Sequence, residues 1–199
     1  VREPNSQYPF GYKERLEAFK PGGILSKRLA LTRYSVLQVG SWVFVHGSIS
    51  PICAKKYTLN DINTSIKNWL LGKSLNNIDD LYHTDDDDDS PFWSRIYSDM
   101  DEWDEHRSIQ QFKETINNLN IRNIRNSSNV IKGMIMGHSP QFMYNKGINS
   151  SYDNRIWRVD IGASKAFGEI DPRDSISELR KVHVLVIEDD SRFHIVKEN

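Results

Sequence analysis

The sequence has little cysteine, no strong net charge and no long apolar run, and each absence excludes a class of protein. Cys53 is the single cysteine in 199 residues, which excludes a framework of intramolecular disulfides and suits a reducing, cytoplasmic setting. The 26 basic and 27 acidic residues nearly cancel, so no global field attracts nucleic acid or an anionic membrane. No apolar run reaches the roughly 20 residues that span a bilayer. We therefore expect a soluble protein whose partners include neither nucleic acid nor a membrane.

The length and the pattern of elements favour one mixed α/β unit. A chain of 199 residues is typical of a single domain or of part of one. Short β-rich runs alternate with amphipathic helical segments, and no internal repeat is evident. We therefore expect residues 1–199 to share one α/β architecture.

Hydrophobic spacing and turn signals give the expected elements. Strands are predicted at residues 35–39, 42–45, 130–136, 155–162, 181–189 and 192–198. Helices are predicted at residues 12–19, 58–74 and 108–120. A hairpin turn is expected at Gly40-Ser41, and Asn60 and Gly72 are expected to cap and end the second helix. The five consecutive aspartates at 85–89 repel one another and predict a solvated, mobile loop rather than a calcium site.

Two histidines follow predicted strands in turns that contain glycine. His46 follows the strand at 42–45, in WVFVHG, and His138 follows the strand at 130–136, in GMIMGHSP. Rigid strands can fix an imidazole, and glycine lets backbone and metal approach closely, so both positions suit metal ligands. A hydrogen-bonded structural histidine is the alternative, and the spacing alone leaves both open.

Five ordered segments resemble one group of phosphatases. WVFVHGSISP resembles the VHGG-type motif of the phosphoprotein-phosphatase superfamily, which is part of the calcineurin-like metallophosphoesterases, and GMIMGHSPQ resembles its downstream GH motif. AFKPGGILSKRLALTR, INTSIKNWLLG and GINSSYDNRIWRVDIGASKAFG resemble the bacterial-like branch called Shewanella-like phosphatases. Together the matches cover most of the chain, from about residue 11 to residue 168.

This resemblance implies a fold, a cofactor and a substrate. The implied fold is a metallophosphoesterase-type sandwich of two sheets flanked by helices, with residues 1–199 as the C-terminal part of one catalytic domain. The implied cofactor is a pair of manganese, iron or zinc ions that activates water for attack on a phosphoryl group, with His46 and His138 as metal ligands. The implied partner is a phosphorylated protein substrate.

Arg95 is the candidate for gripping the phosphoryl group. It lies in SPFWSRIYS, which resembles the WSR segment whose arginine binds substrate phosphate in the family, and it is the one candidate catalytic residue. Arginine can hold two phosphoryl oxygens at once, where lysine offers a point charge. A surface arginine that pairs with nearby acidic residues is the alternative.

Other ionisable residues are candidates for lesser roles. Asp160 and Asp153 could orient a ligating imidazole, and Asp160 could equally satisfy buried backbone groups. The remaining histidines are expected to be packing, surface or solvated residues: His83, His106, His183 and His194.

The chain lacks several motifs that the family uses. GDxHG, GDxxDRG and GNHE, which supply the other metal ligands and an acid histidine from upstream segments, do not occur. Two histidines without bridging carboxylates cannot hold a dinuclear centre, so we expect this chain alone to be inactive. A fragment of a longer phosphatase, favoured by the absence of an initial methionine, or a degenerate or split relative would account for this. Ser48 and Tyr152 also stand where relatives usually carry glycine and cysteine.

The leading interpretation is therefore a metal-dependent phosphomonoester hydrolase of the protein-phosphatase type. Two alternatives stay open. One is a nucleotide or dinucleoside polyphosphate hydrolase, because related members share the histidine motifs. The other is a non-catalytic module that binds a partner or a phosphorylated ligand.

Overall fold

The computed structural model describes residues 8–73, 81, 89–98, 105–123, 129–164 and 180–197. Within those ranges, no helix has the length and apolar character needed to cross a membrane. The loop predicted at residues 85–89 lies outside the described residues, apart from Asp89.

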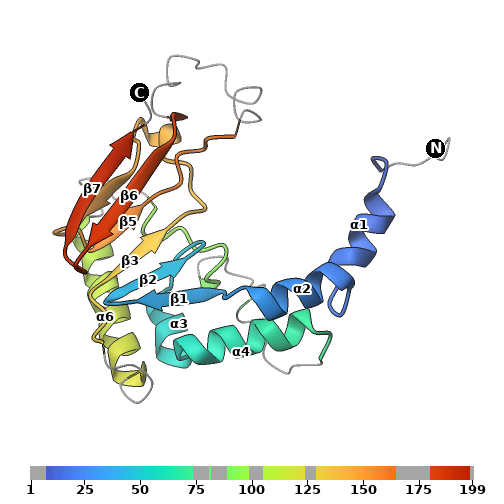
Figure 1. Ribbon diagram of the computed structural model, residues 1–199. Coiled ribbons are helices and arrows are strands. Elements are labelled where there is room, and N and C mark those ends of the chain that lie inside the picture. Colours follow the sequence, from blue (N-terminus) through green and yellow to red (C-terminus); the bar gives the residue numbers. More distant parts are fainter. Residues whose placement is uncertain are drawn as a thin grey trace.

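A mixed five-stranded sheet forms the centre of the molecule (Figure 1). Its strands are β1 (Val36–Val39), β2 (Trp42–Val45), β3 (Gly133–Met136), β4 (Asn149–Ser151) and β5 (Ile156–Arg158). They lie in the order β1-β2-β3-β5-β4, and β2, β3 and β5 are parallel to one another, whereas β1 and β4 are antiparallel strands at the two edges. The carboxyl ends of the three parallel strands therefore meet at one end of the sheet, the usual place for ligands in α/β proteins.

Three helices cover one face of this sheet. They are α3 (Pro51–Lys56), α4 (Leu59–Leu70) and α6 (Glu105–Asn123). Alternate strand residues such as Val43, Met134 and Ile156 pack in one buried cluster with Ile62 of α4 and Phe112 of α6. This cluster is the main hydrophobic core.

A two-stranded sheet covers part of the opposite face. It consists of β6 (His183–Glu188) and β7 (Arg192–Lys197), which form a hairpin. Phe193 of this hairpin packs edge-on against Trp42, with ring centroids 4.9 Å apart, and lies 5.1 Å from Trp157. These aromatic contacts attach the hairpin to the central sheet.

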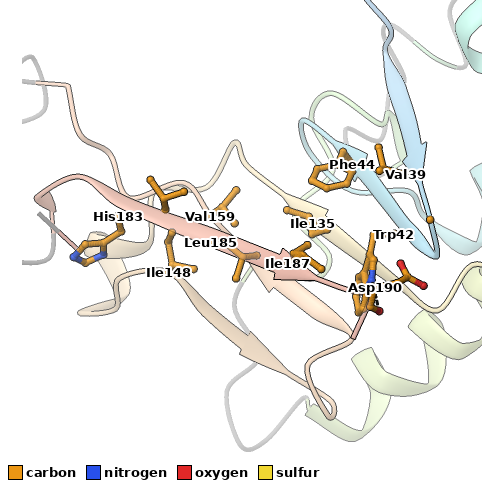
Figure 2. Close-up of a pocket in the computed structure, with 12 residues that line it drawn as sticks. Val39, Trp42, Phe44, Ile135, Ile148, Val159, His183, Leu185, Ile187 and Asp190 are labelled. Carbon is orange, nitrogen blue, oxygen red and sulfur yellow. Dashed lines mark hydrogen bonds between the residues drawn. The ribbon is translucent and has the colours of Figure 1, made fainter. Parts of the chain in front are cut away.

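An apolar cleft of about 730 Å³ lies between the hairpin and the central sheet (Figure 2). Ile135, Ile148 and Leu185 lie along it, with His183 towards one end and Asp190 towards the other. None of the candidate site residues His46, His138 and Arg95 lines this cleft.

Two N-terminal helices extend away from the sheets (Figure 1). They are α1 (Tyr12–Phe19), which buries no residue, and α2 (Ile24–Thr32), which packs against α4. The turn between them is fixed to the end of α4 because the Gly22 N–H donates to the Leu70 carbonyl at 2.9 Å.

The α/β class and most of the predicted elements are confirmed. The three predicted helices correspond to α1, α4 and α6, and the six predicted strands correspond to β1, β2, β3, β5, β6 and β7. Gly72, with a φ of 81°, follows the end of α4 as expected. Asn60 is not the cap, however, because Thr58 precedes the helix and exchanges hydrogen bonds of 3.0 and 2.9 Å with Asp61. The helices α2 and α3 and the strand β4 were not predicted.

Candidate functional site

His46 and His138 lie side by side at the carboxyl ends of neighbouring parallel strands. His46 directly follows β2, and His138 lies two residues beyond β3. The two strands are in register, and the Gly137 N–H donates to the His46 carbonyl at 2.9 Å. The sheet therefore brings together two histidines that are 92 positions apart in the chain.

The two imidazoles are in direct contact. His46 Nε2 lies 3.1 Å from His138 Nδ1, and the ring centroids are 4.9 Å apart. His46 is exposed, whereas His138 is half-buried and its Nε2 has no hydrogen-bond partner among the described residues. His138 also has a φ of 69°, in the left-handed region that is costly for residues other than glycine. Backbone strain combined with an unsatisfied ring nitrogen is typical of a functional residue.

The surroundings of His138 favour its neutral form. Burial lowers the pKa of His138 below its ordinary value, and the charges of Arg95 and His46 lower that pKa further. The charge of Asp160 and the nearby backbone of Trp93 raise the pKa of His138, and both effects are weaker. Neutral imidazole is the form that binds a metal ion, so this environment suits a ligand.

The distance between the two rings fits two donors to one metal ion. Imidazole nitrogens that share an ion at about 2.1 Å lie about 3.0 to 3.4 Å apart for octahedral to tetrahedral angles, and the observed distance is 3.1 Å. Within the described part of the chain, no group of three or more His, Cys, Asp or Glu side chains could hold a metal ion. His46 and His138 therefore fit as part of a donor set that needs further ligands from elsewhere.

Arg95 lies in a segment, residues 89–98, that is hydrogen-bonded to the His46 turn. The Gly47 N–H donates to the Pro91 carbonyl at 2.9 Å. The Ser48 hydroxyl lies 2.8 Å from the Ser94 hydroxyl and 3.1 Å from the Ser94 carbonyl. These contacts bring the residue before Arg95 into the turn that carries His46.

The other end of the same segment is bonded to the His138 turn. The Ser139 hydroxyl donates to the Ser98 hydroxyl at 2.7 Å, and the Gln141 side-chain amide donates to the Ser98 carbonyl at 3.1 Å. Buried Arg158 of β5 donates through Nε to the Tyr97 carbonyl at 2.6 Å. The segment therefore bridges the two histidine turns.

Arg95 itself is exposed, and its charge is close enough to His138 to lower the pKa of that imidazole. Among the residues that the structure describes, its guanidinium forms no ion pair with a carboxylate. The Arg95 guanidinium therefore places a positive charge near the two imidazoles, in a chain of formal charge −1. Such a group can attract an anion such as a phosphoryl group.

Trp93 is a site residue that sequence reasoning missed. Its ring is half exposed and packs edge-on against His138, with centroids 5.4 Å apart. It stands two residues before Arg95 in the same segment, which is the signal that could have identified it.

The two aspartates have different positions. Asp160 follows β5, at the same end of the sheet as both histidines, and its carboxylate accepts from the Gly162 N–H at 2.9 Å. Asp160 thus satisfies a backbone N–H, which is one of the two roles that the sequence left open. Its charge also raises the pKa of His138. Asp153 precedes β5, at the opposite end of that parallel strand, so its candidate role in orienting an imidazole is wrong.

The remaining histidines are packing or surface residues where they are described. His183 is half-buried and lines the apolar cleft, whereas His106 and His194 are exposed. His83 lies outside the described residues.

Comparison with known proteins identifies a viral relative. The chain is 30% identical over 211 residues to uncharacterized protein R398 of Acanthamoeba polyphaga mimivirus, and the match covers 97% of this chain and 79% of R398. The chain belongs to the R398 family. No family model matches the chain.

This R398-family chain also has a plant relative whose function is named. It is 28% identical over 172 residues to Shewanella-like protein phosphatase 2 of Arabidopsis thaliana. The match covers 86% of this chain but 39% of the plant protein, so the chain spans well under half of that relative.

Among solved structures, the R398-family chain is similar to the cold-active protein-tyrosine phosphatase of a psychrophilic Shewanella species. The TM-score is 0.47 and the identity is 14%, and the match covers 83% of this chain and 43% of that protein.

Proposed function

We propose that this chain carries part of the active site of a metal-dependent phosphomonoester hydrolase of the phosphoprotein-phosphatase type, with a phosphorylated protein as substrate. The observation that carries the proposal is the pair of imidazoles at the carboxyl ends of β2 and β3, with 3.1 Å between their facing nitrogens and Arg95 beside them. In this proposal, residues 1–199 are the C-terminal part of a two-sheet metallophosphoesterase domain.

Each residue has a distinct role in the proposed site. His46 and His138 would hold a metal ion, and manganese, iron and zinc all accept imidazole donors. When bound, the ions of such a centre supply an activated water and polarise the phosphoryl oxygens. Arg95 would bind the phosphoryl oxygens through paired N–H groups and neutralise their charge.

The proposed centre needs donors that the described residues do not provide. Two neutral imidazoles leave the charge of the ions uncompensated, and carboxylates are the donors that normally bridge and neutralise such a pair. In the proposal these carboxylates come from segments outside this sequence. We therefore expect residues 1–199 alone to lack hydrolytic activity.

The test compares the chain as given with the product of its complete reading frame. Metal content and hydrolysis of p-nitrophenyl phosphate are measured for both, and for His138→Ala and Arg95→Gln in the longer form. We expect about two metal ions and turnover in the longer form. His138→Ala should lower metal affinity at least about tenfold, and Arg95→Gln should lower kcat/KM about tenfold or more.

His194→Ala is the matched control, because His194 is exposed on the hairpin sheet and is expected to leave both measurements unchanged. Full activity and full metal content in the His138→Ala variant would contradict the proposal. Hydrolysis of nucleotides in preference to phosphopeptides would favour the polyphosphate hydrolase instead. A complete reading frame that neither binds metal nor hydrolyses would leave the non-catalytic binding module.

A further inference from the structure

Ser48 makes a contact that explains its presence beside the candidate ligand His46. The phosphatases that this sequence resembles usually carry glycine at that position, and a serine there adds a hydroxyl near the site. In this structure Ser48 is 1% exposed, and its hydroxyl lies 2.8 Å from the hydroxyl of Ser94, which is equally buried. A buried hydroxyl without a partner is destabilising, so these two serines satisfy each other.

A second serine pair repeats this arrangement on the other side of Arg95. Ser139, the residue after His138, donates to the Ser98 hydroxyl at 2.7 Å, and both side chains are buried. The Ser98 N–H also donates to the Arg95 carbonyl at 2.9 Å, which closes a tight turn that begins at the arginine. Each histidine turn therefore binds one residue that flanks Arg95.

The two pairs fix the base of a long and flexible side chain. Arg95 is exposed, and an exposed arginine loses considerable conformational entropy when it binds in one place. That loss is smaller when the backbone beneath the side chain is already held in position. Without the two hydroxyl pairs, the links that remain from this segment to the histidine turns include the Gly47 to Pro91 backbone hydrogen bond and the Gln141 to Ser98 hydrogen bond.

We propose that Ser48 and Ser139 are positioning residues, which hold the backbone of the Arg95 segment against the two histidine turns through their hydrogen bonds to Ser94 and Ser98. This inference rests on the proposed function, because it assumes that Arg95 binds a phosphoryl group. The serines themselves touch no substrate. They set the distance between the phosphate-binding guanidinium and the metal-binding imidazoles.

A positioning role and a merely structural role give different results in a double-mutant cycle. The probe is inorganic phosphate, and its dissociation constant is measured by NMR titration of the metal-loaded product of the complete reading frame, which is the parent chain of this test. Arg95→Gln should weaken binding about tenfold or more, and Ser48→Ala and Ser139→Ala should each weaken it about three- to tenfold. Combined with Arg95→Gln, each serine change should have less than about a twofold further effect, because the group that it positions is absent.

Ser26→Ala is the matched control. Ser26 is also fully buried and donates a hydrogen bond to a carbonyl, that of Phe19, but it lies in α2. It should lower stability as the other serine changes do and leave phosphate binding unchanged.

Three results would overturn the inference. If Ser48→Ala weakened phosphate binding equally in the parent chain and in the Arg95→Gln variant, the serine would act on the fold alone. An unchanged dissociation constant in both serine variants, with Arg95→Gln still weakening binding, would remove the positioning role and leave the proposed function in place. Failure of the parent chain to bind phosphate, or no effect of Arg95→Gln, would remove the proposed role of Arg95 and this inference with it.

Discussion

Gly47 is the residue at which the His46 turn and the Arg95 segment touch backbone to backbone. A Cβ added at this position would lie 3.0 Å from the carbonyl oxygens of Pro91 and Ser94 and 3.1 Å from the carbonyl carbon of Phe92. These are backbone atoms, so they cannot rotate away as the end of a side chain would. Glycine is required at this position because the two backbones approach each other closely, and not because of an unusual φ angle.

Replacing Gly47 by alanine should therefore separate the two segments. We expect Gly47→Ala to lower the free energy of unfolding by about 1–3 kcal/mol, the usual cost of overpacking a buried site. Urea denaturation followed by tryptophan fluorescence measures this loss. Gly137→Ala is the control, because the nearest atom to its added Cβ is the His46 carbonyl oxygen at 3.4 Å, and it should cost less than about 1 kcal/mol. Equal losses in the two variants would contradict the steric explanation.

Helix α4 begins with a reciprocal pair of hydrogen bonds between Thr58 and Asp61. Thr58→Ala removes the hydroxyl that accepts from the Asp61 N–H, and we expect a loss of about 1 kcal/mol in the free energy of unfolding. Asn60→Ala is the matched control, since Asn60 is exposed within the first turn and caps nothing. Chemical denaturation of the two variants measures both free energies of unfolding and shows which of the two residues caps the helix. A larger loss for Asn60→Ala would restore the cap that the sequence predicted.

Elements with a clear hydrophobic period could be predicted from the sequence, and elements without one could not. Helix α6 presents Phe112 and Leu119 to the core at helical spacing, and both are fully buried. Helix α2 has no such stripe, because its buried residues are the small Ser26 and Ala30. Helix α3 and strand β4 contain six and three residues, too few to show a period.

The sequence was enough to predict which residues belong to the candidate site, but not which of them are in contact. A histidine after a strand is visible in the sequence for both His46 and His138. Their proximity depends on the parallel pairing of β2 with β3, which lie far apart in the chain and whose partners no local pattern specifies. The two serine pairs depend on the packing of residues 89–98 against the histidine turns, which no local pattern specifies, so they too required the structure.

The turn between β6 and β7 links the hairpin sheet to the central sheet. Asp190 accepts a hydrogen bond from the Ser41 N–H at 2.8 Å, and its own carbonyl accepts from the Trp42 indole at 3.1 Å. Lys132 Nζ lies 3.6 Å from the Asp190 carboxylate. Asp190 thereby connects the β6–β7 turn to the β1–β2 turn and to the segment before β3.

This link should make the docking of the hairpin dependent on pH. Hydrogen bonding from the side chain and backbone of Ser41 lowers the pKa of Asp190 below its usual value, and the Lys132 charge lowers that pKa further. A carboxyl group whose pKa is lower in the folded chain stabilises the fold above its unfolded pKa, which is about 3.9. That contribution is lost as the pH falls through the lower folded pKa.

Asp190→Asn tests this dependence, because asparagine keeps an acceptor oxygen and tolerates the positive φ of 60° at this position but does not titrate. At pH 6 we expect the variant to be less stable than the parent chain, since it lacks the stabilised carboxylate. The difference should shrink as the pH falls below about 4, where the parent loses the same contribution. Urea denaturation at pH 6, 4 and 3 measures the two free energies of unfolding. A difference that stays constant across this range would show that the hydrogen bonds of Asp190 link the two sheets without any contribution from its charge.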